Sequence, residues 1–126
     1  MSAYISSALE DYLEAIYLLS GLKTSVRITY IAVQLGISKP SVNRAVNSLK
    51  KLGLVSHEPY GAIILTQSGH ELGEQVSRRH IMIKKFLMSV LNLSESDADN
   101  EACRIEHGIS QNTVEKIENF MKDAAV

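Results

Sequence analysis

The sequence of 126 residues has little of what marks several protein classes. A single cysteine, Cys103, permits no disulfide within the chain, which excludes a disulfide scaffold and favours a reducing compartment. Two prolines, seven glycines and 45% hydrophobic residues exclude a collagen-like repeat and a disordered chain. No apolar run approaches the roughly 18 residues that span a membrane. The first residues also lack the basic and apolar regions of a signal peptide, so we expect a cytoplasmic protein without a membrane partner.

An excess of charge of either sign is also missing, because the formal net charge is −1. Taken alone, this total argues against the basic surface of many nucleic-acid-binding proteins. The charges are nevertheless unevenly distributed. Residues 15–57 contain six Lys and Arg residues and no Asp or Glu, whereas from residue 71 onward ten acids face seven bases, a balance of −3. This asymmetry predicts a front part that binds a polyanion and a rear part with a different task.

The spacing of apolar residues predicts a mainly α fold with one small β-hairpin. Helices are expected at residues 8–19, 29–35, 39–52, 68–91, 95–107 and 111–122, with hairpin strands at 54–57 and 62–66 around the turn Glu58-Pro59-Tyr60-Gly61. Candidate helix caps are Ser6 or Ser7, Thr29, Ser38, Thr66 or Ser68, Ser94 and Ser110. The order is therefore helix, helix-turn-helix, hairpin and three further helices.

Residues 28–44 carry a specific signal for a DNA-reading helix-turn-helix. A short helix ends at Gly36, where a tight turn needs a positive φ, and a buried Ile37 follows. The next helix opens after Ser38 with Lys39-Pro40, and proline is tolerated in a first helical turn because its missing N–H is not needed there. The second helix of such a motif enters the major groove of double-stranded DNA and meets base edges with its first turns.

The candidate DNA contacts fall into two groups. Arg44 has the geometry to bind guanine and Asn43 to bind adenine, whereas Lys50, Lys51 and the hairpin are expected to touch phosphate. The full set is Arg27, Ser38, Lys39, Pro40, Ser41, Asn43, Arg44, Asn47, Lys50, Lys51, His57 and Tyr60. A winged helix used for protein contacts is the competing interpretation, but it gives the acid-free interval no role. Such modules usually bind paired half-sites as dimers, so the C-terminal helices would have to supply the dimer surface.

A second group of side chains has the chemistry of a metal site. Asp11 and Glu14 are one turn apart on the first helix, and Cys103, Glu106 and His107 share one helix face. His80 lies within the apolar register of the long helix. Carboxylate, thiolate and imidazole together suit a divalent transition metal. Singly, each has an ordinary explanation: a solvated glutamate, a small buried cysteine or a core histidine.

Five segments together carry a resemblance to a known family: the helix-turn-helix at 28–44, Leu9–Tyr17, Leu65-Thr66-x-x-Gly69, Arg79-His80 and Glu101–His107. They resemble the diphtheria-toxin-repressor family of metal-dependent transcriptional regulators. They are most similar to its short manganese-transport-regulator branch, and the match covers nearly the whole chain. The resemblance implies a winged helix-turn-helix DNA-binding domain at residues 1–70. It also implies a helical dimerisation and metal-binding domain at 71–126 that shares ligands with the first helix. The expected function is a homodimeric regulator, a repressor, of metal-ion homeostasis that binds operator DNA when metal is bound.

The family's ligand positions match Asp11, Glu14, His80, Cys103, Glu106 and His107. The resemblance implies one site from Asp11, Cys103, Glu106 and His107, and a second from Glu14 and His80 with Glu106 bridging, hence one or two ions per subunit. The chain departs from the manganese branch at Cys103, where that branch has a carboxylate, and from the iron branch at Asp11 and Lys84, where that branch has methionine and glutamate. A hard carboxylate with a soft thiolate favours Mn²⁺ or Fe²⁺ over Zn²⁺ in our interpretation.

Two other function classes compete with this one. A metal-independent winged-helix repressor would sense a small organic ligand, which predicts an apolar pocket and no response to chelators. A metal-dependent hydrolase could use Glu106-His107 beside Cys103, but the sequence has no HExxH helix, no GxSxG turn and no nucleophile beside a base. A catalytic site also needs an open coordination position, which this ligand set would close. We therefore expect no enzyme and no organic cofactor.

Overall fold

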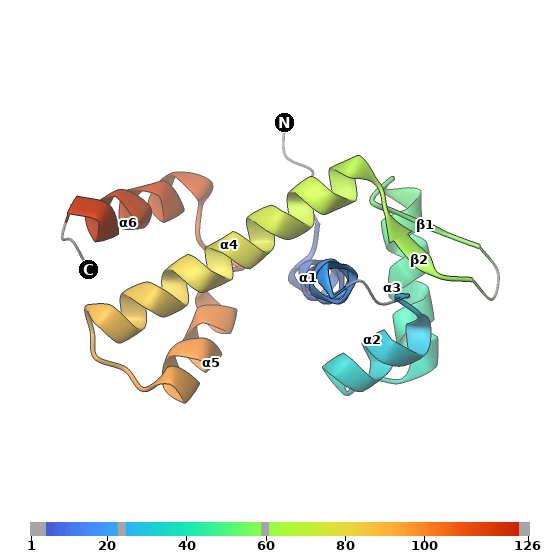
Figure 1. Cartoon of the computed structure of the whole chain (residues 1–126), viewed down its shortest axis with the longest axis horizontal. Coiled ribbons are helices and arrows are strands. Elements are labelled where there is room, and N and C mark those ends of the chain that lie inside the picture. Colours follow the sequence, from blue (N-terminus) through green and yellow to red (C-terminus); the bar gives the residue numbers. More distant parts are fainter. Residues whose placement is uncertain (1–4, 23–24, 59–60, 124–126) are drawn as a thin grey trace. The chain divides into compact units, whose positions relative to one another are not determined.

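The computed structural model describes residues 5–22, 25–58 and 61–123. In chain order they form α1 (Ser7–Gly21), α2 (Ile28–Leu35), α3 (Lys39–Lys51), β1 (Val55–His57), β2 (Ile63–Leu65), α4 (Gln67–Ser89), α5 (Glu95–Ile105) and α6 (Gln111–Asp123) (Figure 1). The chain forms two compact units, Met1–Glu74 and Gln75–Val126. The predicted order of helices and hairpin is confirmed. Within the described residues, no helix is both long and apolar enough to cross a membrane.

The helices of the N-terminal unit begin where short polar residues offer a cap. Ser6 Oγ accepts a hydrogen bond from the Leu9 N–H, and Ser38 Oγ accepts one from the Ser41 N–H. Gly36 ends α2 with φ 66°, a left-handed conformation that costs glycine nothing and allows the sharp turn into α3. The predicted cap at Thr29 is wrong, because α2 begins at Ile28 after Arg27, whose side chain makes no cap hydrogen bond.

The hairpin of β1 and β2 is antiparallel, with Val55 opposite Leu65 and His57 opposite Ile63. The predicted turn tip at Pro59 and Tyr60 lies outside the described residues. The Ile63 N–H donates to the Val26 carbonyl at 2.7 Å, so the hairpin is also joined to the segment that precedes α2. These contacts make the hairpin the wing of a winged helix-turn-helix.

One apolar core holds α1, α2, α3 and the wing together. Its buried members are Leu13, Ile16, Val26, Ile31, Ala32, Val42, Val46, Leu49, Leu54, Val55 and Ile63. The predicted burial of Ile37 is wrong, because Ile37 is 38% exposed, and Leu52, the last residue of the helix expected at 39–52, is 48% exposed. Both follow directly on a helix end, Ile37 after the Gly36 turn and Leu52 as the C-cap of α3, so the helical periodicity no longer decides which way they point.

Gly69, in the first turn of α4, lies against the backbone of Leu54. A Cβ atom at this position would stand 1.9 Å from the Leu54 carbonyl oxygen, so only glycine fits. Next to it, the Thr66 hydroxyl donates to the Gly53 carbonyl at 2.7 Å and accepts from the Gly69 N–H at 3.0 Å. The Leu65-Thr66-x-x-Gly69 pattern therefore fastens the start of α4 to the loop between α3 and β1.

The C-terminal unit consists of α5, α6 and the part of α4 from Gln75 onward. Ile83, Leu87, Ala98 and Ala102 form its buried core. Ser94 caps α5 and Ser110 Oγ accepts from Thr113 near the start of α6, as predicted. The expected extension of α5 to His107 is wrong by two residues, since the helix ends at Ile105 and its last two candidate ligands lie in the turn that follows.

Candidate metal centre and DNA-binding surface

The exposed face of α3 carries most of the predicted DNA contacts. Ser38, Lys39, Pro40, Asn43, Arg44 and Asn47 are exposed and Ser41 is half-buried, whereas Val42, Ala45, Val46 and Leu49 point into the core. Arg44 Nη2 donates to Ser41 Oγ at 3.2 Å, and the two serine hydroxyls at the start of the helix lie 3.0 Å apart. The polar side chains at the start of α3 are thus arranged against one another before any DNA is bound.

The end of α3 is tied to the wing. Lys50 Nζ donates to the His57 carbonyl oxygen of β1 at 3.2 Å, while Lys51 is exposed. The His57 side chain is half-buried and Arg27 stands exposed in front of α2. The prediction for Tyr60 falls outside the described residues. The remaining eleven candidates lie on or beside the helix-turn-helix and the wing, and their contact with DNA stays a prediction.

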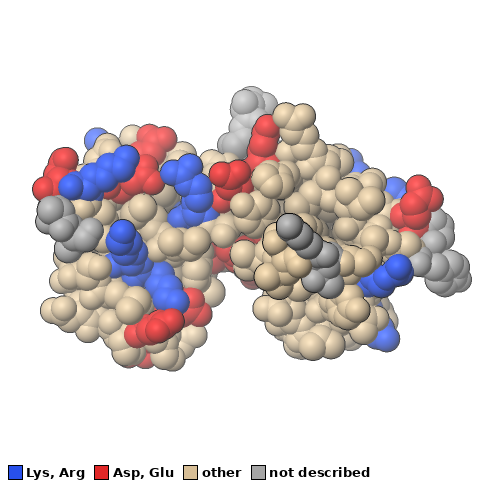
Figure 2. All heavy atoms as spheres, in the orientation of Figure 1, with Lys and Arg blue, Asp and Glu red and all other residues tan. Residues whose placement is uncertain are grey.

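The two units differ in how their charges are arranged. In the N-terminal unit the exposed bases of α3 and its flanks have no acidic side chain among them between residues 15 and 57. On the face drawn in Figure 2, basic and acidic side chains alternate over the part of the surface built from α4, α5 and α6. A surface of mixed charge attracts a polyanion less than the basic surface of the N-terminal unit would.

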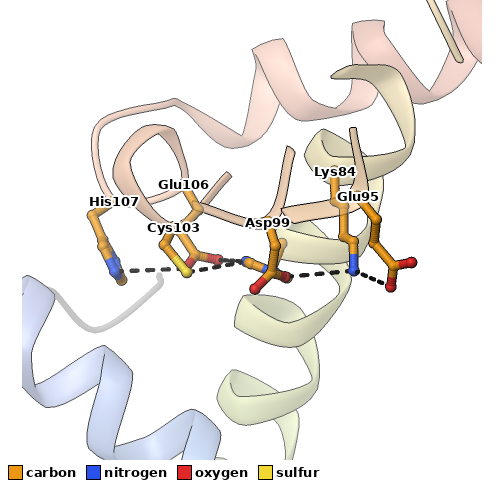
Figure 3. Close-up of polar contacts among 7 residues, drawn as sticks. Lys84, Glu95, Asp99, Cys103, Glu106 and His107 are labelled. Atoms are coloured by element: carbon orange, nitrogen blue, oxygen red, sulfur yellow. Dashed lines mark hydrogen bonds and ion pairs between the residues drawn. The ribbon is translucent and has the colours of Figure 1, made fainter. Parts of the chain in front are cut away.

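The candidate metal centre of the C-terminal unit surrounds the carboxylate of Glu106. His80 comes from α4, Cys103 from α5, and Glu106 and His107 from the turn after α5. Glu106 Oε2 lies 3.4 Å from His80 Nδ1, and Glu106 Oε1 lies 3.7 Å from His107 Nε2. Cys103 Sγ is 3.8 Å from His80 Nδ1, and His80, Cys103 and Glu106 can place one donor atom each within 4.8 Å of one another. Figure 3 shows Cys103, Glu106 and His107 gathered at the end of α5.

Glu106 is fully buried, with 0% of its surface exposed, yet neither carboxylate oxygen accepts a hydrogen bond from the described residues. Burying a carboxylate without donors costs several kcal/mol, at an order of magnitude of about 2–7 for a polar group and more for a charge. Its backbone is held in place, because Arg79 Nη1 donates to the Glu106 carbonyl at 2.8 Å. A fixed carboxylate with imidazole and thiol groups around it fits a divalent transition metal ion, which would supply the missing positive partner.

Asp99 and Lys84 also contact this centre; the sequence analysis missed Asp99 and named Lys84 only as a departure from the iron branch. His80 Nε2 lies 2.8 Å from Asp99 Oδ1, within hydrogen-bond distance, and Lys84 Nζ lies 3.6 Å from the same oxygen and 3.5 Å from Glu95 Oε1. The hydrogen bond with His80 is the main cause that lowers the pKa of the Asp99 carboxyl below its usual value, and the nearby Lys84 ammonium adds to it. A signal was available, because Asp99 precedes Cys103 by one helical turn and Lys84 follows His80 by one turn.

The predicted ligands Asp11 and Glu14 lie one turn apart on α1 of the N-terminal unit. Asp11 is exposed and Glu14 is half-buried, beside the buried Leu13 and Ala15. Their spacing agrees with the expectation that both carboxylates lie on one side of the helix. Their role as ligands stays a prediction.

Two family models together match nearly the whole chain. Residues 5–63 match the N-terminal DNA-binding domain of the iron dependent repressors, and residues 66–126 match their metal-binding and dimerisation domain. A transcriptional regulator of the helix-turn-helix type from Methanocaldococcus jannaschii is 37% identical over 119 residues, which are 94% of this chain and 95% of the relative.

Solved structures of regulators show the same fold. The manganese regulator SloR is 31% identical with a TM-score of 0.81, over 95% of this chain and 55% of SloR. A manganese-dependent transcriptional repressor in complex with manganese is 26% identical with a TM-score of 0.81, over 90% of this chain and 52% of that protein. This chain thus spans about half the length of these two regulators. By both domain models and by its relatives, the chain belongs to the iron-dependent repressor family, also described as the diphtheria-toxin-repressor family: it is a DNA-binding transcriptional regulator with a metal-binding and dimerisation domain, and not an enzyme.

Proposed function

We propose that this regulator is a repressor of metal-ion homeostasis that binds operator DNA as a homodimer only when it holds Mn²⁺ or Fe²⁺. The observation that carries the proposal is Glu106, a fully buried carboxylate with two imidazoles and a thiol around it and no hydrogen-bond donor to its oxygens among the described residues. A regulator of chromosomal genes acts in the cytoplasm, which is where we place this one.

The proposed ligands are His80, Cys103, Glu106 and His107 of the C-terminal unit, completed by Asp11 and Glu14 of α1. A bound divalent cation supplies the positive charge that these groups lack. The mixture of hard carboxylates and one thiol suits Mn²⁺ or Fe²⁺ better than Zn²⁺, and Glu106 between two histidines leaves room for one ion or two. The manganese-bound repressor that resembles this chain supports the choice of Mn²⁺ as the first ion to test.

The proposed mechanism uses the two groups of ligands as a link between the units. Without metal, Asp11, Glu14 and Glu106, with Cys103 when ionised, repel one another, so the two units are free to hinge. When these side chains share a cation, α1 is held to the C-terminal unit, and the angle between the two reading helices of a dimer is set. The two N-terminal units of the dimer are then already oriented when the operator binds, so DNA binding no longer includes the entropic cost of orienting them.

The experiment is operator selection from random DNA, followed by affinity measurements at fixed salt with Mn²⁺, Fe²⁺, Zn²⁺ or a chelator. We expect Mn²⁺ or Fe²⁺ to tighten operator binding by about 5–150-fold, and linkage requires DNA to tighten metal binding by the same factor. With chelator, binding should be weak and strongly salt-dependent. Identical affinities with chelator and metal would overturn the proposal and favour the metal-independent repressor that senses an organic ligand.

A pair of matched variants separates the ligand role from general damage. Glu106→Gln keeps the volume of the side chain but removes its charge, so the metal response should vanish while weak DNA binding remains. Glu115→Gln makes the same chemical change at an exposed position of α6 and should leave the response intact. Equal responses of the two variants would contradict the assignment of Glu106.

A further inference from the structure

The two ring nitrogens of His80 face different partners. Nε2 lies 2.8 Å from Asp99 Oδ1, whereas Nδ1 lies 3.4 Å from Glu106 Oε2 and 3.8 Å from Cys103 Sγ. An ionised carboxylate only accepts hydrogen bonds, so the proton of a neutral His80 belongs on Nε2. The lone pair of Nδ1 then lies on the side of the ring that faces Glu106 and Cys103, two of the other candidate ligands.

The Asp99 carboxylate is itself held from its outer side. Lys84 Nζ lies 3.6 Å from Asp99 Oδ1 and 3.5 Å from Glu95 Oε1. The Lys84 side chain is 27% exposed and that of Asp99 50% exposed, so these contacts are partly screened by water and orient the carboxylate more than they stabilise the fold. Lys84 comes from α4, as His80 does, and Asp99 comes from α5. The contacts therefore join the two helices that carry His80 and Cys103.

We propose that Asp99 is a positioning residue that fixes the Nε2–H tautomer and the ring orientation of His80, and that Lys84 holds Asp99 in this place. The proposal rests on the proposed function, because it assigns how one of the proposed ligands presents its donor atom. Metal-binding histidines commonly donate their second N–H to a carboxylate, and removing that partner costs about 10–100-fold in metal affinity.

The competing role for Asp99 is that of a direct ligand. Its position argues against this, because Oδ1 already receives the His80 N–H and faces the Lys84 ammonium. A cation that also bound Oδ1 would lie near the positive charge of Lys84, and it would compete with the His80 proton for the same oxygen. The Asp99 carboxylate also lies at Nε2, on the opposite side of the ring from Glu106 and Cys103.

The test uses the full chain and two readouts. The first is the long-range proton–nitrogen correlation spectrum of the histidine rings without metal, with the His80 signals assigned from a His80→Gln sample. The second is the Kd for Mn²⁺ alone, from the electron paramagnetic resonance signal of free Mn²⁺. The variants are Asp99→Ala, Asp99→Asn, which keeps an acceptor oxygen, and the control Glu101→Ala, an exposed acid of the same helix.

We expect wild type and Glu101→Ala to show His80 as the Nε2–H tautomer with equal Mn²⁺ affinity. Asp99→Ala should give a mixture of tautomers and lose about 10–100-fold in affinity, and Asp99→Asn should keep the tautomer with a smaller loss. An unchanged tautomer and affinity in Asp99→Ala overturn the positioning role. It is also overturned if Asp99→Asn keeps the tautomer but loses as much affinity as Asp99→Ala, because Asp99 would then be a ligand. If wild type binds neither Mn²⁺ nor Fe²⁺, the proposed function fails, and the tautomer of His80 in Asp99→Ala still decides this inference.

Discussion

On α3 the candidate DNA-reading side chains stand in solvent above an apolar core, whereas the candidate metal ligands converge on a carboxylate that solvent does not reach. The polar groups at the start of α3 satisfy one another, as the hydrogen bonds between Ser38, Ser41 and Arg44 show. The oxygens of Glu106 have no such donors among the described residues. The polar groups at the start of α3 are therefore hydrogen-bonded within their own unit, whereas the C-terminal unit buries a carboxylate whose desolvation cost a bound cation would offset.

The largest effect that we predict is a loss of stability in the N-terminal unit. Gly69→Ala should lower the free energy of unfolding by about 3 kcal/mol or more, because the new Cβ would overlap the Leu54 carbonyl oxygen and a backbone segment would have to shift to relieve the overlap. Thermal unfolding followed by circular dichroism measures the change. Gly21→Ala is the control, since a Cβ there meets nothing within 4 Å, and a loss of similar size in both variants would contradict the explanation.

Metal should stabilise the C-terminal unit by the next largest amount. At a Mn²⁺ concentration of 100 times the Kd, the folded chain should gain about 2.7 kcal/mol, because the ion binds the folded ligand set only. Hydrogen exchange with and without Mn²⁺ should show added protection around His80 and Glu106, and in α1 as well if Asp11 and Glu14 bind the ion. Added protection confined to α3 and the wing would contradict this prediction, because it would place the metal-dependent stabilisation in the N-terminal unit.

Arg44→Ala should weaken binding to the selected operator by about 2 kcal/mol and relax the preference at one base position. Its Mn²⁺ affinity should remain that of wild type in the absence of DNA. Lys51→Ala provides the contrast, since loss of a phosphate contact weakens all sequences equally and lowers the salt slope by about 1. The measurement is fluorescence anisotropy on the operator and on mutated operators across a salt series. If Arg44→Ala lowered the Mn²⁺ affinity, the assignment of DNA reading and metal binding to separate groups of residues would be wrong.

The smallest predicted effects compare one cap from each unit. Ser38→Ala and Ser94→Ala should each lower stability by about 1 kcal/mol, because each removes the hydroxyl that accepts an N–H in the first turn of its helix. Only Ser38→Ala should also weaken operator binding with metal present, since its helix carries the reading side chains. Chemical denaturation and the same anisotropy titration check both statements, and an equal loss of operator affinity in the two variants would refute the second.

Much of the fold could be predicted because its signals are local. Ser6, Ser38 and Ser94 each make their cap within three residues, and Gly36 takes its positive φ for reasons visible in the sequence. Ile37 and Thr29 were misjudged at helix ends, where the apolar periodicity stops and tertiary packing decides orientation.

The candidate metal centre could be predicted only in part. Spacing grouped Cys103, Glu106 and His107, although the last two lie in the turn after α5, and the family resemblance placed His80 with them. Asp99 and Lys84 depend on how α4 packs on α5, which sets contacts across 19 and 15 residues of sequence. Helical spacing places each of these residues one turn from a predicted ligand, but it does not show that α4 and α5 pack so that their side chains meet.

The serine caps also bear on how quickly the protein becomes functional after synthesis. In the described residues, a serine accepts a hydrogen bond from an N–H near the start of each of four helices, and the two paired strands, Val55–His57 and Ile63–Leu65, are close in sequence. Most contacts that order the backbone are thus local, and chains dominated by local contacts fold in about microseconds to milliseconds. Folding should therefore add no delay to regulation, and the response time of the repressor would be governed by the arrival of its ion.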